Sequence, residues 1–107
     1  MAITYKDPVQ AATSATTLTD LLTTTTQVVV STVIVCNRGG SATTFRISVA
    51  PAGAADATSQ YLYHDVPIAA NDTMKITFGL SMASGSKLRV YAGNANLSFS
   101  AFYAEVT

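Results

Sequence analysis

Apolar and polar residues alternate along much of the chain, which is typical of β-strands that bury one face. The alternation is most regular from Thr73 to Leu80, where Met, Ile, Phe and Leu occupy every second position. The segments 44–50 and 87–92 show the same period of two. We therefore predict three strands here, each packing one face against a core and turning the other toward solvent.

Two further segments are apolar at both parities. The segment 27–36, QVVVSTVIVC, is predicted to be covered on both sides, at the centre of a sheet or under a partner subunit. The glycines of the following NRGGS, 37–41, predict a hairpin that brings 44–50 back beside it. In 97–106 the apolar parity changes near Ser100, which predicts a β-bulge or a strand buried on both faces.

Three tyrosines occupy positions that the alternation predicts to face outward. Tyr61 and Tyr63 lie on one parity of the segment 60–68, and Tyr91 lies on the outward parity of 87–92. Exposed aromatic residues are enriched at protein interfaces and in carbohydrate sites. A protein interface is the interpretation we favour, with ordinary partial burial and sugar stacking as the alternatives.

Segments rich in turn-forming residues separate the strands, at 51–59, 69–72, 81–86 and 93–96, the last predicted to be a tight hairpin. About seven short strands at this spacing, with no long helix, predict an all-β fold. We expect a single antiparallel β-sandwich of the jelly-roll or immunoglobulin-like type. Pro8 and an Ala/Ser/Thr-rich stretch predict an extended N-terminal arm over 1–17, followed by the β-sandwich domain over 18–107.

Composition and charge narrow the function classes. Of the 107 residues, 49% are hydrophobic and only 11% are charged, and six basic residues balance six acidic ones. A protein that binds nucleic acid needs an excess of Lys and Arg to neutralise phosphates, so no nucleic-acid partner is expected. A net charge of zero favours self-association, which is a property of assembly subunits.

No residue pattern indicates catalysis. His64 and Asp65 are adjacent, which on a regular strand aims them at opposite faces and prevents an acid–base pair. Cys36 is the single cysteine, so neither an intrachain disulfide nor a cysteine-based zinc site is expected. The glycines fit no phosphate-binding motif. We expect no enzyme activity, no cofactor and no metal.

No segment has the roughly 18 consecutive apolar residues of a membrane-spanning helix, so no membrane partner is expected. The first ten residues contain Lys6, Asp7 and Pro8 and lack the apolar run of a signal peptide. We therefore expect a chain that is made in the cytoplasm without a secretion signal.

Two long stretches, 28–73 and 88–107, resemble a group of small structural proteins of tailed bacteriophages. The matching features are VCNRG, read as a hairpin, the TFRI strand, the PAGA loop, the PIAAND turn and the VYAGNANLSF ending. Together the two stretches cover over half of the chain, and none of these features is a catalytic signature.

The resemblance implies a β-sandwich subunit of a virion, made in the host cytoplasm and attached to the capsid or tail. The role it favours is a capsid decoration, or cement, protein that binds the major capsid protein or other virion proteins and stabilises the head as a homo-oligomer, either trimer or dimer. The alternative is a tail, neck or baseplate adaptor or fibre component with a carbohydrate-binding face. The interface candidates are Ile3, Tyr5 and Val9 in the arm and Tyr61, Tyr63 and Tyr91 on the strands.

Overall fold

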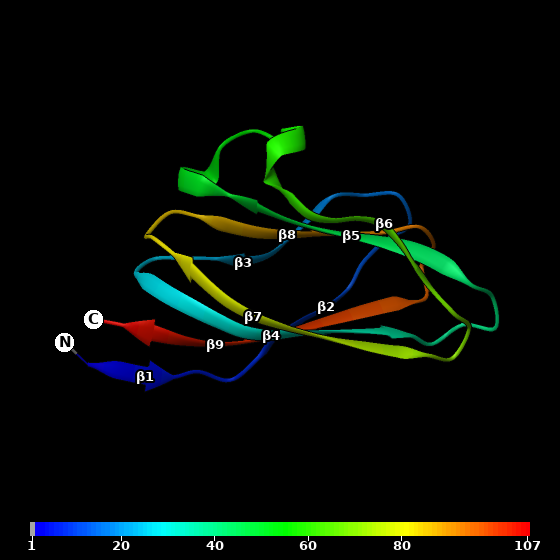
Figure 1. The fold of residues 1–107 in the computed structure, drawn as a ribbon, viewed down its shortest axis with the longest axis horizontal. Coiled ribbons are helices and arrows are strands. Elements are labelled where there is room, and N and C mark those ends of the chain that lie inside the picture. Colours follow the sequence, from blue (N-terminus) through cyan, green and yellow to red (C-terminus); the bar gives the residue numbers. More distant parts are fainter. Residues whose placement is uncertain (1) are drawn as a thin grey trace.

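The computed structural model describes residues 2–107, and these form two antiparallel β-sheets packed face to face (Figure 1). The strands are β1 (Ile3–Tyr5), β2 (Val9–Ala12), β3 (Thr19–Thr23), β4 (Gln27–Asn37), β5 (Thr43–Ala50), β6 (Tyr61–Ile68), β7 (Thr73–Met82), β8 (Lys87–Ala92) and β9 (Leu97–Val106). Two short 3₁₀ turns, η1 (Pro51–Gly53) and η2 (Thr58–Gln60), interrupt the loop between β5 and β6. The predicted all-β, antiparallel sandwich is confirmed.

Strand pairing identifies the sandwich as a jelly roll. One sheet has the order β1-β9-β4-β7, with β2 also pairing with β9, and the other has the order β3-β8-β5-β6. The pairs β2 with β9, β3 with β8, β4 with β7 and β5 with β6 are those of one long hairpin wound around a common core. Apart from β1, which extends the first sheet to five strands, the eight strands β2 to β9 form two four-stranded sheets in the jelly-roll arrangement, so of the two predicted types the jelly roll is the one observed.

Two predicted hairpins are wrong. The segment 37–41 was expected to fold 44–50 back onto the preceding strand, but β4 and β5 belong to different sheets. The segment 93–96 likewise joins β8 in one sheet to β9 in the other. Glycine and asparagine mark a chain reversal in both places, but they do not determine whether the chain returns to the same sheet or crosses to the facing one.

The strand β4 lies at the centre of its sheet, as predicted, but it is not buried on both faces. Val28, Val30, Val33 and Val35 point into the core, and each is at most 1% exposed. A β-bulge between Val30 and Thr32 changes the inward parity from even to odd. Among residues 2–107 no layer covers the opposite face, so Val29 is 37% exposed.

The last strand, β9, keeps one phase along its whole length. Leu97, Phe99 and Ala101 are buried, and Tyr103 packs against the same core. The irregularity predicted near Ser100 lies instead in the partner strand, where the bulge in β4 is opposite the step from Phe102 to Tyr103. The even-numbered apolar residues of β9 therefore face outward.

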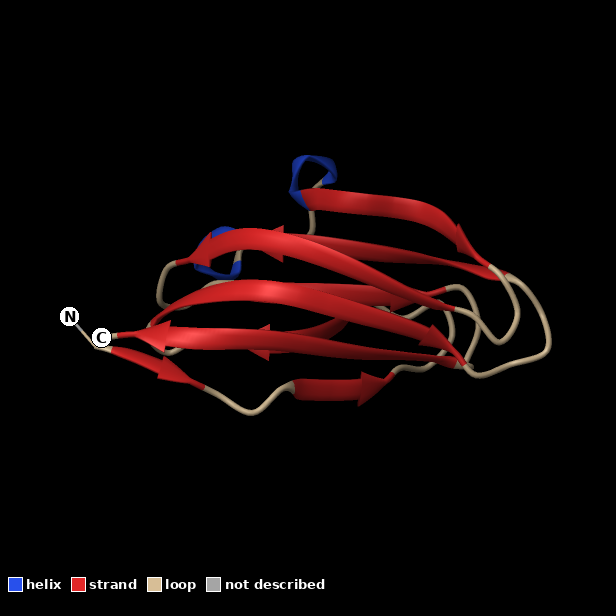
Figure 2. Cartoon of the chain, turned by 60° about the horizontal axis from the view of Figure 1, so that its bottom comes forward, coloured by secondary structure: helices blue, strands red, loops and turns tan. Residues whose placement is uncertain are grey.

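The N-terminal segment is extended and follows the edge of β9. First β1 pairs with the end of β9, and then β2 pairs with its earlier half. Backbone hydrogen bonds join Ala2 and Thr107, with N···O distances of 2.6 and 2.8 Å. Both ends of the chain therefore lie at the same end of the sandwich (Figures 1 and 2). None of the described residues forms a helix long and apolar enough to cross a membrane.

Candidate interaction site

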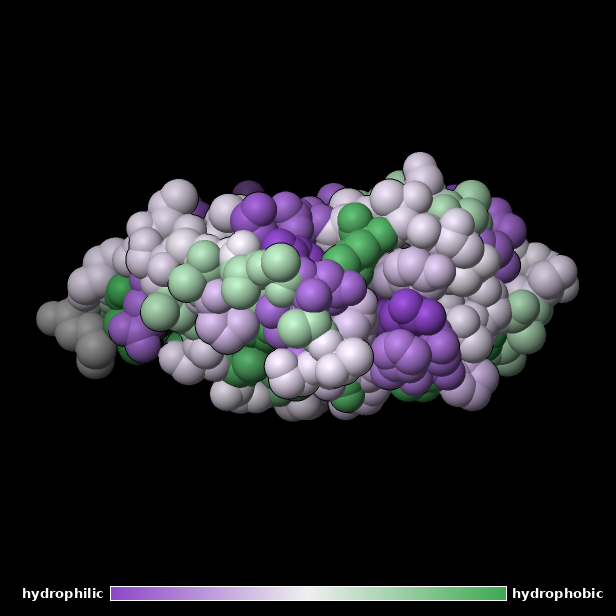
Figure 3. All heavy atoms as spheres, turned by 90° about the horizontal axis from the view of Figure 1, so that it is seen from above, coloured by the Kyte–Doolittle hydropathy of each residue, from purple (hydrophilic) through white to green (hydrophobic). Residues whose placement is uncertain are grey.

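The outer faces of the two sheets differ in chemistry. The four-stranded sheet carries two ion-paired clusters, one around Asp20 and one around Arg46. Figure 3 looks onto the side that carries the 51–60 loop, where strongly hydrophilic groups stand among weakly polar and apolar residues. The five-stranded sheet instead turns Ser and Thr side chains and an apolar groove outward.

Asp20 on β3 binds two cations on β8. Lys87 Nζ lies 3.1 Å from Asp20 Oδ2, and Arg89 Nε lies 3.0 Å from Asp20 Oδ1. Burial alone would raise the pKa of Asp20, but hydrogen bonds from Lys87 and Arg89 together outweigh burial and lower it. Arg89 Nη1 also donates to the carbonyl oxygen of Ala54 at 2.9 Å, so this cluster fastens the 51–60 loop to the sheet.

Arg46 organises the second cluster. Its Nε and Nη2 donate to Asp65 Oδ1 and Oδ2 at 2.7 and 3.3 Å, a two-pronged contact. Hydrogen bonds from Arg46 lower the pKa of Asp65, and the same contact raises the pKa of Arg46. The guanidinium carbon lies 4.3 Å from the centre of the Tyr91 ring, a cation–π contact that occupies one face of this outward tyrosine.

His64 and Asp65 do not lie on opposite faces, so that expectation is wrong. The distance from His64 Nδ1 to Asp65 Oδ2 is 3.5 Å. The cause is a β-bulge: Phe45 pairs with Val66 and Ile47 with Tyr63, which places both His64 and Asp65 opposite Arg46. Asp65 adopts a positive φ of 52°, a conformation that Asp tolerates better than most residues. Two hydrogen bonds from Arg46 hold the Asp65 carboxylate, in addition to its longer contact with His64.

The three tyrosine candidates do not form one platform. Tyr61 donates a hydrogen bond to Asp56 Oδ2 at 3.1 Å and meets His64 edge to face at 5.2 Å. Burial raises the pKa of Tyr61, and the bond to Asp56 raises it further. Tyr63, which was predicted to face outward, packs against the core, because the bulge at Asp65 reverses the parity of β6. Its ring lies 6.3 Å from Phe45 and 6.0 Å from Phe78.

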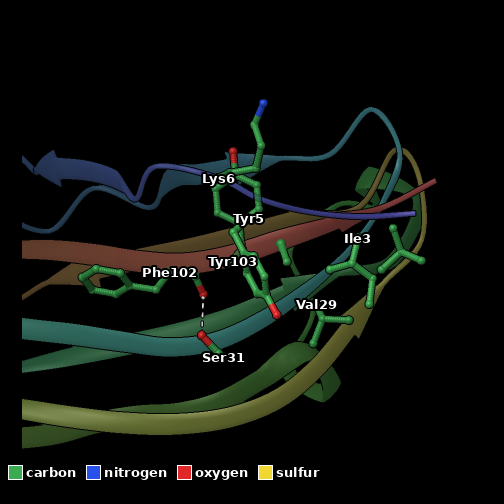
Figure 4. A pocket seen from close by; sticks show the side chains of 9 residues that line it. Ile3, Tyr5, Lys6, Val29, Ser31, Phe102 and Tyr103 are labelled. Atoms are coloured by element: carbon green, nitrogen blue, oxygen red, sulfur yellow. Dashed lines mark hydrogen bonds between the residues drawn. The ribbon is translucent and has the colours of Figure 1, made fainter. Parts of the chain in front are cut away.

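The five-stranded sheet carries an apolar groove on its outer face, near the chain ends. We call it the β1–β9–β4 groove after the strands that form it; its volume is about 430 Å³. It is lined by Ile3, Tyr5, Lys6, Val29, Ser31, Phe102, Tyr103, Ala104 and Val106 (Figure 4). A hydrogen bond from the Ser31 hydroxyl to the Phe102 carbonyl oxygen, 3.1 Å long, joins β4 to β9 at the bulge in its floor.

Strand register explains why these side chains meet. Tyr5 on β1 pairs with Ala104 on β9, which pairs in turn with Val29 on β4. Directly opposite residues in antiparallel strands point to the same face, so the three lie in one row. Ile3 and Val106 form the next row. The groove therefore follows from apolar residues at the outward parity of three neighbouring strands.

The groove leaves apolar side chains unusually accessible. Tyr5 is 86% exposed, Ile3 57%, Val29 37% and Phe102 36%. Isolated exposed apolar residues are ordinary on protein surfaces, but a contiguous patch usually marks a binding surface. This patch is the strongest candidate site among residues 2–107, and its apolar chemistry suits contact with another surface. No group of three or more His, Cys, Asp or Glu that could hold a metal occurs in that range.

The interface candidates from the arm divide between two environments. Ile3 and Tyr5 line the groove, whereas Val9 on β2 packs against the core. Sequence reasoning did not single out Val29, Phe102 or Val106 as surface residues. Their signal is present in the apolar character of 27–36 and 97–106 at both parities, which predicts cover on both faces and, for 27–36, leaves a partner subunit as one possible cover.

Comparison with known proteins identifies a solved structure of similar fold. Neither a protein-family model nor a curated protein sequence matches this chain. A solved structure, a pentameric capsid protein isolated from metagenomic phage sequences, superposes with a TM-score of 0.52 and 14% sequence identity. The match covers 94% of this chain and 61% of that one, so this chain is similar to only part of the longer protein. At this identity the likeness shows a shared fold.

Proposed function

We propose that this chain is a structural subunit of a tailed-bacteriophage virion. The observation that carries the proposal is the likeness of 94% of the chain to a phage capsid protein. Jelly rolls also occur in lectins and cupins, so the fold alone does not assign a function. The resemblance of 28–73 and 88–107 to small phage structural proteins supports the same class independently.

Within the virion, we propose that the subunit decorates the capsid and cements the coat lattice. A protein that binds the assembled lattice in preference to free coat subunits stabilises the assembly by mass action. When the concentration of free decoration protein is a hundred times its Kd, the stabilisation is about 2.7 kcal/mol per site. Two features support a contact role. The outer face of the five-stranded sheet is nearly uncharged, and the β1–β9–β4 groove offers apolar area for burial.

The proposed mechanism is mechanical and requires no catalysis. Each bound copy buries protein surface, and a specific contact of standard size buries roughly 1,200–2,000 Å² in total. The many equivalent sites of a capsid multiply this contribution. In both clusters each carboxylate and each cation contacts an opposite charge of the same subunit, so we assign the clusters to folding and not to chemistry on a substrate.

Cryo-electron microscopy of intact particles, with the copy number determined against the capsid lattice, tests the proposal. Copies on most lattice positions would support decoration. A few copies at the neck or tail would contradict decoration and favour the adaptor or fibre role. Absence of the chain from particles would contradict the virion role altogether. As a second test, particles lacking the protein should lose their genome at a lower temperature than complete particles.

A further inference from the structure

The β1–β9–β4 groove has side chains that project beyond it as well as a hollow between them. Tyr5 and Ile3 lie on β1 along one side of the hollow, and Val29 lies on β4 along the other (Figure 4). Tyr5 remains 86% exposed and Ile3 57% exposed, because only one side of each contacts the groove wall. A small molecule seated in the hollow would leave their outer surfaces in water. A partner that covers them must extend across the rim, as a protein surface does.

The surroundings of the groove are compatible with a copy of the same surface. The rim carries one cation, Lys6, and its Nζ lies 3.9 Å from the Glu105 carboxylate of the same chain. Each copy therefore brings one ion pair to the rim of the groove, and the further cation of the same sheet face, Lys75, lies on β7 outside the groove. Since the whole chain also has a net charge of zero, two copies meet without long-range repulsion.

We propose that the β1–β9–β4 groove is the surface through which two copies of this chain form a two-fold symmetric dimer. In a two-fold interface the same patch lies on both partners, so projecting and recessed parts must occur together on one surface. The groove meets this requirement, with Tyr5 and Phe102 as projecting aromatic residues beside the hollow. The interface packs the outer faces of two five-stranded sheets, and exposed aromatic anchors of this kind dominate interface energies.

The size of the sheet face fits a stable dimer. The molecule measures 45 × 27 × 19 Å, and a view along the shortest axis shows the two sheets one above the other (Figure 1). The face of each sheet is therefore spanned by the 45 Å and 19 Å dimensions. A standard interface buries roughly 800 Å² on each partner, so a dimer of that size covers most of the sheet face and not the groove alone. The apolar groove occupies the end near the termini, and Ser and Thr side chains surround it as a polar rim.

Sedimentation velocity on the full chain, between roughly 1 and 200 µM, tests the dimer. The wild-type chain should change from monomer to dimer across this range. Val29→Lys places a charge in the apolar groove of each copy, where the dimer would bury it, so the dissociation constant should rise at least about tenfold. Leu62→Lys is the matched control, because Leu62 is 45% exposed but lies on the opposite sheet. This control should dimerise as the wild type does.

A second variant keeps the test independent of any folding defect in Val29→Lys. Tyr5→Ser removes a side chain that is 86% exposed, so at a concentration where both chains are monomeric it should leave the circular dichroism spectrum and melting temperature unchanged, while weakening the dimer at higher concentration. A wild-type chain that stays monomeric throughout, a ring of three or five copies, or equal weakening by Leu62→Lys would each overturn the proposal. The dimer uses the same sheet face that supports the proposed contact with the coat lattice, so particles in which this face contacts coat subunits would also overturn the dimer. The virion role itself is tested separately, by localisation of the chain in particles.

Discussion

The buried side chain of Asn37 joins two connections at one end of the sandwich. Asn37 ends β4 and is 1% exposed. Its Nδ2 donates to the carbonyl oxygens of Ser41, at 2.9 Å, and Ala69, at 3.1 Å, and its Oδ1 accepts from the Gly39 N–H at 3.0 Å. Ser41 belongs to the crossover toward β5 and Ala69 to the turn between β6 and β7. One amide therefore fixes both segments.

Asn37→Asp preserves the shape of the side chain but removes both donors. Two hydrogen bonds are lost, at about 1 kcal/mol each, and the two partly buried carbonyl oxygens then face a carboxylate oxygen, which adds roughly 1–3 kcal/mol. We expect the free energy of unfolding at pH 7 to fall by about 3–5 kcal/mol, a large part of the roughly 5–15 kcal/mol of a typical domain. Urea denaturation followed by circular dichroism measures the loss, and the melting temperature should fall by roughly 15–30 °C.

The pH dependence of this variant provides a further check. Burial beside two carbonyl oxygens raises the pKa of the new carboxyl in the folded state, because the protonated acid can donate to one of them. The deficit relative to wild type should therefore shrink as the pH falls from 7 toward 4. Asn94→Asp is the control: Asn94 Oδ1 only accepts, from Asn96 N–H at 2.9 Å, and a carboxylate accepts equally well. A deficit at pH 7 no larger than that of Asn94→Asp would refute the reasoning.

Three further perturbations test other parts of the structure. Ser48 is fully buried, and its Oγ has no hydrogen-bond partner among the described residues. In urea denaturation, Ser48→Ala should therefore leave the free energy of unfolding unchanged or raise it by up to about 1 kcal/mol. A fall in the free energy of unfolding by more than about 1 kcal/mol would show that Oγ has an unrecognised partner. Ala52 has φ 55°, so Ala52→Gly should raise the melting temperature by relieving roughly 1 kcal/mol of strain, whereas Ala54→Gly, at φ −57°, should not. Asp20 and Asp65 have lowered pKa values, so their ion pairs stabilise the fold above the ordinary carboxyl pKa, and this stabilisation is lost as the pH falls through the lowered values. NMR titration of the two carboxyl groups should give midpoints below 3.8, and these midpoints should rise in 1 M salt. Midpoints at or above 3.8 would contradict the ion pairs.

Alternation predicted the strands that have one polar face. The segments 73–80 and 87–92 form β7 and β8 with the expected residues inward. When apolar residues occupy every second position, only one face of the strand can pack against the core, because the other face is polar. Pairing could not be predicted in the same way. In a jelly roll β4 lies between β7 and β9, whose residues are far along the chain, and local turn signals contain no information about such neighbours.

Bulges account for most of the side chains that were placed on the wrong face. Each bulge adds one residue to one strand and reverses the parity beyond it. At Asp65 this turned Tyr63 into the core and brought His64 beside Asp65. Asp is among the residues that tolerate a positive φ, but it occurs in regular strands and turns as well, so its presence alone did not locate the bulge.

Apolar residues at both parities of a strand predict a cover on both faces, and the structure shows where the chain itself provides none. On β4 and β9 the inward parity is covered by the facing sheet, whereas Val29 and Phe102 on the outward parity remain 37% and 36% exposed. Leu62 is 45% exposed too, but it lies on a bulged edge strand of the opposite sheet, where the hollow that it lines is formed with the 51–60 loop. The difference between the burial that a pattern predicts and the burial that the fold achieves therefore locates a contact surface. For this chain that difference is concentrated in the β1–β9–β4 groove, which is why the groove, and not the charged face, is the surface from which we derive the dimer.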